Sequence, residues 1–403
     1  MNSAAAGNAT ESGTSGAGAL SGIKVLDFGQ MVSAPYCAKL FSDFGADVIK
    51  VEPPEGDPAR SFQRMLGADM PNNPVFELDN RGKRSVVLDL GVPADREAVL
   101  ALIDSADVFL SNIRPSALAR LGLDHQTLLA RHPRLVYGII TGYGLDGPDA
   151  DRAAYDIAAF WARSGIAHLL TPPGANPPFQ RGGMGDHSVA SSFAGAIAAA
   201  LFARERSGRG QLVSTSLLRQ GVYTVGFDLN MKLGWGLHPQ IGMRETMGNP
   251  AINNYMAADG RRFWIVGLEG ERHWPPLARA VGHPQWLDDP RFATPMARAQ
   301  NAGELIALLD AVFATRTLDE WAVIFDADPD FFWAPIHSAD DVLADPQLRA
   351  CGALVDVPDA YGTTTMVASP TDFHGTPWSP RWIAPQLGEH TDEVLGERRS
   401  QNG

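Results

Sequence analysis

The sequence predicts an α/β protein with a doubly wound, Rossmann-like large domain and a smaller α+β domain. Short apolar runs alternate with helical patterns over residues 21–220, as in parallel strands joined by helices. After residue 220 the chain becomes rich in Gly, Met and aromatic residues, and a hairpin pattern and helical patterns follow. A chain of 403 residues is too long for one hydrophobic core, so more than one domain is expected.

The first elements predict a βαβ unit. Residues 23–28 (IKVLDF) form an apolar run between two glycines, residues 35–44 have helical spacing, and residues 46–52 (ADVIKVE) form a second strand. Strand, helix and strand in this order favour parallel neighbours with a right-handed connection. The alternation continues with strands expected at 85–90, 107–110 and 135–141, and helices at 94–105 and 118–129.

A long buried helix is expected at residues 188–205, which are rich in Ala, Leu, Ile and Phe and carry their charges in the last turn. The segment before it, RGGMGD, brings Asp186 to the start of this helix. Its glycines, Gly182, Gly183 and Gly185, permit backbone conformations closed to other residues and leave room beside the carboxylate. Two interpretations follow, because Asp186 is either a helix N-cap or a nucleophile in a glycine-lined pocket.

The remaining segments complete a domain plan. Residues 1–20 are small and polar and predict a disordered tail, and residues 221–250 predict a crossover linker with irregular structure over 221–247. Residues 251–328 predict the small domain, with a hairpin at 253–266 closed by Asp259-Gly260 and helices at 272–281, 302–313 and 318–324. Residues 329–403 predict an aromatic-rich connector and a return to the large domain.

Composition narrows the function classes. A net charge of −13 argues against nucleic acid or an anionic membrane as the main partner. No apolar run reaches the length of a membrane span, and the N-terminal residues lack the pattern of a signal peptide. Two cysteines, Cys37 and Cys351, make no disulfide framework, so a cytoplasmic location is expected. The ten histidines form no HExxH motif or Cys/His cluster, so no metal site is expected.

Two further motifs are weak. Gly142, Gly144 and Gly147 fit GxGxxG after a strand, but no helix pattern opens there to bind a pyrophosphate, which argues against a nicotinamide or flavin site. Asp186-His187-Ser188 contains the residue types of a catalytic triad, but GxSxG is absent.

Basic residues gather in or beside the loops at strand ends of the first domain. On an acidic protein, such a group predicts a local site for a phosphorylated ligand. The group comprises Lys50, Arg60, Arg81, Lys83, Arg84, Arg114 and Arg120.

These segments together resemble the class III CoA-transferases, the CaiB/BaiF family, whose fold is shared with the alpha-methylacyl-CoA racemases. The resemblance runs in order from Leu20 to Leu395. It rests on GIKVLDFGQMVSAPYCAKLFSDFGADVIKVEPPEGDPAR, NRGKRSVVLDL, ADVFLSNIRPSALARLGL, PRLVYGIITGYGLDGP, AAYDIAAF, GDHSVASSFAGAIAAALFARERSGRGQ, DDPRF, ADPQLRACG and LGEHTDEVL.

The resemblance implies an enzyme that moves CoA from an acyl-CoA to a carboxylic acid. It implies that Asp186 is the nucleophile that carries an aspartyl-CoA thioester, with coenzyme A as co-substrate and no permanently bound cofactor. It also implies an interlocked homodimer. Supporting roles are expected for Gly185, Tyr155 and Tyr143, and CoA contacts for Asn112, Ile113, Arg114, Arg120, Lys83, Val32 and Ser33.

Departures from the family pattern bear on the reaction and the substrate. The racemases have a histidine where this chain has Tyr155, and tyrosine is a poor proton-exchange partner near neutral pH, which favours transferase over racemase. A racemase, epimerase or isomerase of acyl-CoA, or a CoA-binding protein without catalysis, remain the alternatives. A family glutamine is replaced by Val32. Aromatic residues at 160–161, 235 and 331–333 predict a bulky, apolar acid, unless they pack a domain junction.

Overall fold

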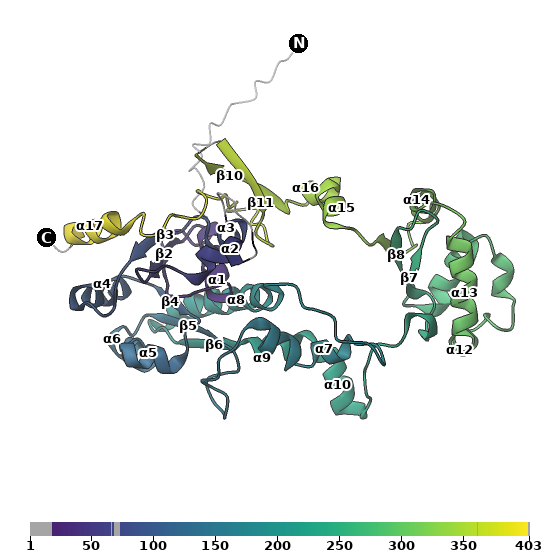
Figure 1. Ribbon diagram of the computed structural model, residues 1–403, viewed down its shortest axis with the longest axis horizontal. Helices are drawn as coiled ribbons and strands as arrows, with labels where there is room; N and C mark the ends of the chain where they lie inside the picture. The colour runs from purple at the N-terminus through teal and green to yellow at the C-terminus, as the bar shows by residue number, and fades with distance from the viewer. Residues whose placement is uncertain (1–17, 66, 68–72, 361, 402–403) are drawn as a thin grey trace, which may run out of the picture. The chain divides into compact units, whose positions relative to one another are not determined.

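The computed structural model describes residues 18–65, 67, 73–360 and 362–401, and the chain divides into two compact units (Figure 1). The larger unit contains the described residues up to 167, residues 179–237 and the residues from 349 onward. The smaller unit contains residues 168–178 and 238–348.

The larger unit is built on one parallel sheet of six strands. The strands are β1 (Lys24–Asp27), β2 (Asp47–Glu52), β3 (Arg84–Val87), β4 (Val108–Ser111), β5 (Val136–Thr141) and β6 (Leu212–Ser216). Their order is β3-β2-β1-β4-β5-β6, and every neighbouring pair is parallel. This order is that of a doubly wound sheet, as predicted, and it reverses direction between β1 and β4. The pattern analysis missed β6.

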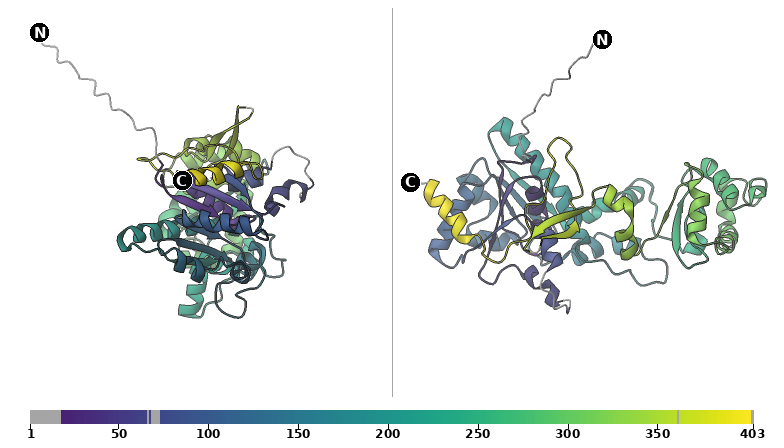
Figure 2. Two further views of the ribbon diagram at one scale, coloured as in Figure 1. Left: turned by 90° about the vertical axis from the view of Figure 1, so that its left-hand side faces the viewer. Right: turned by 90° about the horizontal axis from the view of Figure 1, so that it is seen from above.

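Helices cover both faces of this sheet (Figure 2). On one face α1 (Ser33–Asp43) packs along α8 (Met184–Ser207). Gly138 of β5 permits the close approach of α8, because a Cβ there would lie 2.8 Å from the Ile197 side chain. On the other face, side chains of the strands share one core with α4 (Pro93–Asp104), α5 (Pro115–Leu121), α6 (His125–Arg131) and α17 (Thr391–Gln401).

Shorter elements complete the larger unit. The residues expected to be irregular at 221–247 are helical in their first half, because α9 and α10 extend to Trp235 with only Val225 between them. The C-terminal residues add a two-stranded antiparallel ribbon. These elements are η1 (Pro58–Ser61), α2 (Phe62–Met65), α3 (Pro74–Asn80), a π-helical segment (Ile157–Ala162), α9 (Leu217–Thr224), α10 (Gly226–Trp235), β10 (Leu354–Asp359) and β11 (Gly362–Val367). Two short helices, α7 (Ile166–Leu169) and α16 (Pro346–Ala350), contain the points where the chain passes from one unit to the other.

The smaller unit has a three-stranded antiparallel sheet of β7 (Ile252–Met256), β8 (Arg262–Val266) and β9 (Trp333–Pro335). The predicted hairpin is confirmed, with Gly260 at a φ of 82° in its turn. The three predicted helices are also present. The helical segments are η3 (Arg244–Thr246), α11 (Gly270–Ala280), η4 (Pro284–Leu287), α12 (Pro295–Gln300), α13 (Ala302–Phe313), α14 (Leu318–Asp326) and α15 (Ala339–Ala344).

Two of the three connector aromatics, Phe331 and Trp333, pack against the core of the smaller unit, whereas Phe332 is 47% exposed. Phe331 stacks on Phe325 with ring centroids 4.6 Å apart, and Trp333 contacts the same ring at 5.2 Å. Trp333 is held in this position because it belongs to β9, which pairs with β8. The sequence pattern did not predict this strand.

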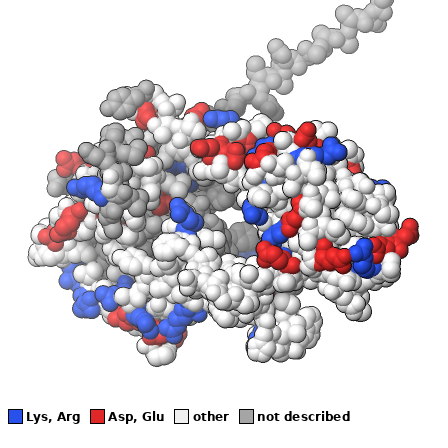
Figure 3. All heavy atoms as spheres, turned by 45° about the vertical axis from the view of Figure 1, so that its right-hand side comes forward, with Lys and Arg blue, Asp and Glu red and all other residues white. Residues whose placement is uncertain are grey.

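The surface carries both signs of charge. Acidic and basic side chains are interspersed over the face shown in Figure 3. The net charge of the whole chain is −13. Among the described residues, no helix has the length and apolar character needed to cross a membrane.

Candidate active site

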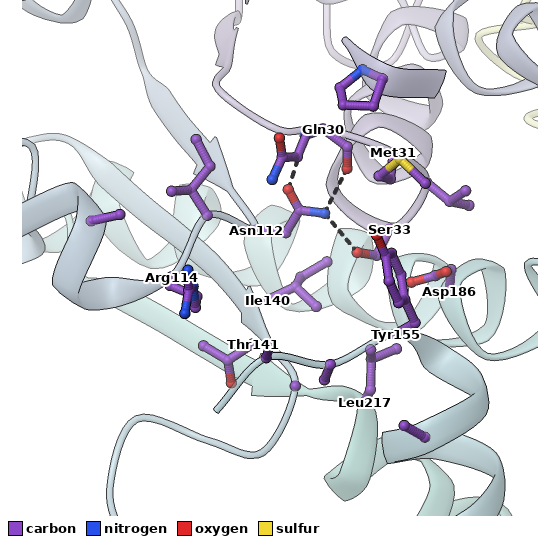
Figure 4. Close-up of a pocket in the computed structure, with 18 residues that line it drawn as sticks. Gln30, Met31, Ser33, Asn112, Arg114, Ile140, Thr141, Tyr155, Asp186 and Leu217 are labelled. Atoms are coloured by element: carbon purple, nitrogen blue, oxygen red, sulfur yellow. Dashed lines mark hydrogen bonds between the residues drawn. The ribbon is translucent and has the colours of Figure 1, made fainter. Parts of the chain in front are cut away.

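A pocket of about 610 Å³ opens at the carboxyl ends of β1, β4 and β5 (Figure 4). The segments that follow these strands line it at residues 30–33, 112–114 and 141–142. Residues 153–155, Ala158, Asp186 and Leu217 complete most of the wall. In a doubly wound sheet the crevice beside the reversal of strand order is where ligands bind, and this pocket lies there.

The pocket brings together most of the residues that the sequence singled out. Those on its wall are Val32, Ser33, Asn112, Ile113, Arg114, Tyr155 and Asp186. Sequence reasoning missed Gln30, Met31, Ile140, Thr141 and Leu217. Gln30 and Met31 follow the end of β1, and Ile140 and Thr141 form the end of β5. Their position at the carboxyl ends of parallel strands is the signal that could have identified them.

Asp186 lies in the first turn of α8 and does not cap it. The N-cap is Gly183, which adopts a left-handed conformation with φ 74°, and the helix begins at Met184. The interpretation of Asp186 as an N-cap is therefore wrong, because the glycines let the helix start earlier than residue 188. Asp186 instead presents its carboxylate to the pocket from a helix N-terminus, which favours negative charge.

Gly185 permits a close contact beneath this carboxylate. A Cβ at Gly185 would lie 2.5 Å from the Phe160 ring, a distance that no side chain tolerates. The Gly185 N–H donates to Asp156 Oδ2 at 3.2 Å, and Gln180 Nε2 donates to the same oxygen at 2.9 Å. The Gly185 N–H therefore already has an acceptor in the Asp156 carboxylate.

The environment of Asp186 disfavours its ionised form. Burial is the main cause, and the nearby Asp156 carboxylate adds to it, so that the pKa of Asp186 rises to about 7. The neighbouring His187 imidazole and the Ser33 hydroxyl act in the opposite direction on this pKa. Near neutral pH the ionised carboxylate is consequently more basic, and a stronger nucleophile, than an exposed aspartate.

Five of the seven residues in the predicted basic group form ion pairs inside the larger unit. The sequence showed the charges but not the carboxylates that pair with them, of which all but Asp47 are buried. The pairs are Lys50–Asp57, Arg60–Glu52, Arg81–Asp43, Lys83–Asp27 and Arg84–Asp47, with N–O distances of 2.7–2.8 Å.

Lys83 in particular is fully buried and does not line the pocket. Its Nζ donates at 2.8 Å to Asp27 Oδ2, to the Pro35 carbonyl and to Asn80 Oδ1. An ammonium has three donors, so none is left for a ligand. The Lys83 ammonium is therefore not free to make the expected contact with CoA.

Arg114 is the one cationic side chain, and Asp186 the one carboxylate, on the described wall of the pocket. Figure 4 shows them on opposite sides of it. Arg120 is exposed in the last turn of α5, and it is not on the wall. Tyr143 is also off the wall, and its ring contacts the Arg163 guanidinium at 4.9 Å. The described residues hold no group of three His, Cys, Asp or Glu side chains arranged to bind a metal ion.

The fold and the pocket define a class of protein: a doubly wound enzyme with one activated carboxylate opposite an arginine. Comparison with known proteins identifies the family. Residues 20–391 match CoA-transferase family III, and the chain belongs to that family of enzymes. The resemblance drawn from the sequence motifs is thereby confirmed.

Individual relatives cover nearly the whole chain. An acyl-CoA transferase of Fusarium pseudograminearum is 34% identical over 96% of this chain and 87% of its own length. The (R)-2-hydroxy-4-methylpentanoate CoA-transferase of Clostridioides difficile is 29% identical over 93% of this chain and 94% of its own. A crystal structure of a CaiB/BaiF family protein from Brucella suis is similar with a TM-score of 0.82 and 29% identity, over 94% of this chain and 99% of that one.

Proposed function

We propose that this enzyme transfers CoA from an acyl-CoA to a carboxylic acid through an aspartyl-CoA thioester on Asp186. The observation that carries the proposal is Asp186 itself. It is the one carboxylate on the described wall of the pocket, and its pKa is raised to about 7. A free carboxylic acid is a poor electrophile, and an enzyme carboxylate overcomes this by covalent catalysis.

The reaction proceeds in two halves. Asp186 attacks the carbonyl carbon of the donor thioester, the C–S bond breaks, and CoA leaves as its thiolate from a mixed anhydride. The thiolate then attacks the Asp186 carbonyl carbon and displaces the donor carboxylate, which leaves the aspartyl-CoA thioester. The acceptor carboxylate attacks this thioester, and the same steps run in reverse to form the new acyl-CoA.

The charges of the pocket support one orientation of CoA. We place the thioester at Asp186 and the anionic end of CoA toward Arg114, on the opposite side of the pocket. Arg120 follows on the same helix, α5, and its exposed guanidinium adds positive charge outside the wall.

The acid is proposed to be bulky and largely apolar, although not for the reason that the sequence suggested. Phe160 is buried behind Gly185, and neither residue 235 nor residues 331–333 are on the pocket wall. The larger apolar side chains that line it are instead Met31, Val32, Ile113, Ile140 and Leu217. The relative from Clostridioides difficile is named for a branched 2-hydroxy acid, which is consistent with such a substrate.

The racemase alternative requires a second proton-transfer group besides Asp186. Tyr155, which stands where the racemases have a histidine, is on the pocket wall and is 67% exposed. Because the reference pKa of tyrosine is about 10, it exchanges protons slowly near neutral pH. Deuterium incorporation at the α-carbon of an acyl-CoA in D₂O would be the result that favours the racemase.

A homodimer is proposed on the basis of an apolar surface on α9 and α10. Tyr223, Phe227, Leu233 and Trp235 are each at least 76% exposed. Apolar groups of this size and number on adjoining helices favour burial by a partner, and we propose a second copy of this chain. Light scattering after size-exclusion chromatography tests this, and a monomer at micromolar concentration would contradict it.

The function is tested by assaying a panel of acyl-CoA donors against branched 2-hydroxy, aromatic and dicarboxylic acids. The wild-type protein is expected to form a new acyl-CoA, and Asp186→Asn is expected to form none. Asp146→Asn, which changes an exposed carboxylate outside the pocket, serves as the control. Wild-type turnover by a folded Asp186→Asn protein would overturn the proposal.

A further inference from the structure

Asn112 holds the loop after β1 by its side-chain amide. Its Oδ1 accepts from the Gln30 backbone N–H at 2.9 Å, and its Nδ2 donates to the Gln30 carbonyl at 2.8 Å. The second Nδ2 hydrogen is directed to Ser33 Oγ, at 3.1 Å (Figure 4). The sequence motif suggested that Asn112 contacts CoA, whereas its side chain makes three contacts with protein atoms.

These contacts leave the amide only one orientation. A flipped amide would place its NH₂ against the Gln30 N–H and its oxygen against the Gln30 carbonyl, two repulsive pairings. The group that faces Ser33 is therefore a donor. Because Ser33 Oγ accepts from it, the single hydroxyl hydrogen of Ser33 is left to donate elsewhere.

Asp186 is the nearby group that can accept this hydrogen. Ser33 and Asp186 both lie on the pocket wall, and Figure 4 shows Asp186 beside Ser33 on the side away from Asn112. Ser33 is only 4% exposed, so water competes little for the hydroxyl. A carboxylate is an acceptor only, so a contact between the two groups runs from the Ser33 hydroxyl to Asp186.

We propose that Ser33 is a catalytic residue, whose hydroxyl donates to the Asp186 oxygen that becomes an oxyanion, and that Asn112 is the residue that positions it. This inference rests on the proposed covalent route through Asp186.

The chemistry of each half-reaction needs such a donor. When CoA thiolate attacks the Asp186 carbonyl carbon of the mixed anhydride, a C–S bond forms and the carbonyl oxygen takes up the electron pair. The tetrahedral intermediate then expels the donor carboxylate and restores the carbonyl. Ser33 donates a hydrogen bond to this oxygen throughout and transfers no proton, so the step balances without a further reactant. A donor already in place before charge develops stabilises the transition state most.

The first experiment compares Ser33→Ala with Ser42→Ala. Ser42 is buried on the same helix, and its hydroxyl donates to the Gly82 carbonyl at 2.8 Å, away from the pocket. Ser33→Ala is expected to lower kcat on the order of 100-fold with little change in KM for acyl-CoA. Loss of the donor also raises the pKa of Asp186, so the acidic limb of kcat/KM moves to higher pH. A kcat and a pH profile equal to those of Ser42→Ala would overturn the proposal.

The second experiment uses Asn112→Asp, which replaces the donor facing Ser33 by an acceptor. The introduced carboxylate accepts the Ser33 hydrogen and turns the hydroxyl away from Asp186, so kcat is expected to fall as it does in Ser33→Ala. Asn112→Asp also disturbs the Gln30 contacts, and a double-mutant cycle with Ser33→Ala separates the two effects. Non-additive losses in kcat are expected, and fully additive losses would show that Asn112 does not act through Ser33.

Failure of this inference differs from failure of the proposed function. If Asp186→Asn is inactive while Ser33→Ala keeps full turnover, only the role of Ser33 is wrong. If a folded Asp186→Asn protein retains turnover, the covalent route itself is wrong. Circular dichroism and thermal unfolding of each variant establish that a loss of activity is not a loss of fold.

Discussion

Replacing Asp186 by asparagine is expected to remove activity and, at alkaline pH, to stabilise the protein. The pKa of Asp186 in the folded protein is about 7, against an ordinary value of 3.8, chiefly because the carboxylate is buried. The folded state therefore holds this proton more tightly than the unfolded state does. Below the unfolded pKa of 3.8, Asp186 takes nothing from the free energy of unfolding. As pH rises from 3.8 to about 7, the buried charge lowers the free energy of unfolding progressively, and above about pH 7 the loss is complete.

The size of this cost follows from the two pKa values. At about 1.36 kcal/mol per pKa unit, the difference between 3.8 and about 7 corresponds to about 4 kcal/mol of lost stability. Asp186 retains some exposure, which lets water screen the charge, so we expect a measured difference of roughly 1–3 kcal/mol. Asparagine has nearly the same shape and no charge, and its side-chain oxygen can accept a hydrogen bond as the carboxylate can.

The assay is urea unfolding of wild-type, Asp186→Asn and Asp146→Asn proteins at about pH 5 and about pH 8.5, which bracket most of the expected change. Asp186→Asn should be the most stable at the higher pH, and its advantage over wild-type should shrink at the lower pH. Asp146→Asn should follow the wild-type protein. An advantage that does not change with pH, or an Asp186→Asn protein less stable than wild-type at the higher pH, would refute the reasoning.

Three further outcomes are expected. The kcat/KM for acyl-CoA should fall as pH is lowered through about 7, because protonated Asp186 is no nucleophile; a pH–rate profile flat between pH 6 and pH 8 would contradict this. Gly185→Ala should destabilise the protein by about 1–3 kcal/mol in thermal unfolding, because its Cβ would overlap the Phe160 side chain, and an unfolding temperature equal to that of wild-type would contradict this. Arg114→Ala should raise KM for acyl-CoA by about 10-fold or more at similar kcat, with a smaller effect from Arg120→Ala. An unchanged KM in Arg114→Ala would move the phosphates of CoA elsewhere.

Local patterns predicted the order of the elements in both units. Strands such as 23–28 and 46–52 are short apolar runs, and their alternation with helical spacing predicted a parallel sheet. The pattern failed where tertiary contacts decide. β6 is only partly buried and β9 is three residues long, so neither forms a clear apolar run.

The candidate site was predictable where a residue's role depends on its neighbours in sequence. The glycines beside Asp186 predicted a carboxylate at the start of a long helix, which the structure confirms. Roles that depend on distant partners were not predictable. Lys83 meets its partner Asp27 across 56 residues, and Asn112 reaches Gln30 across 82, so the pattern showed a cation and an amide but not what they bind.

The central claim is that Asp186 becomes covalently activated during turnover. The most direct measurement is peptide mass spectrometry of the protein after incubation with the acyl-CoA panel and hydroxylamine, which converts an aspartyl thioester or anhydride to a hydroxamate. The account predicts a hydroxamate on Asp186, formed only when an acyl-CoA is present and absent from an Asp186→Asn control. Turnover of a substrate pair with no modification of Asp186, or with the hydroxamate on another carboxylate, would contradict it.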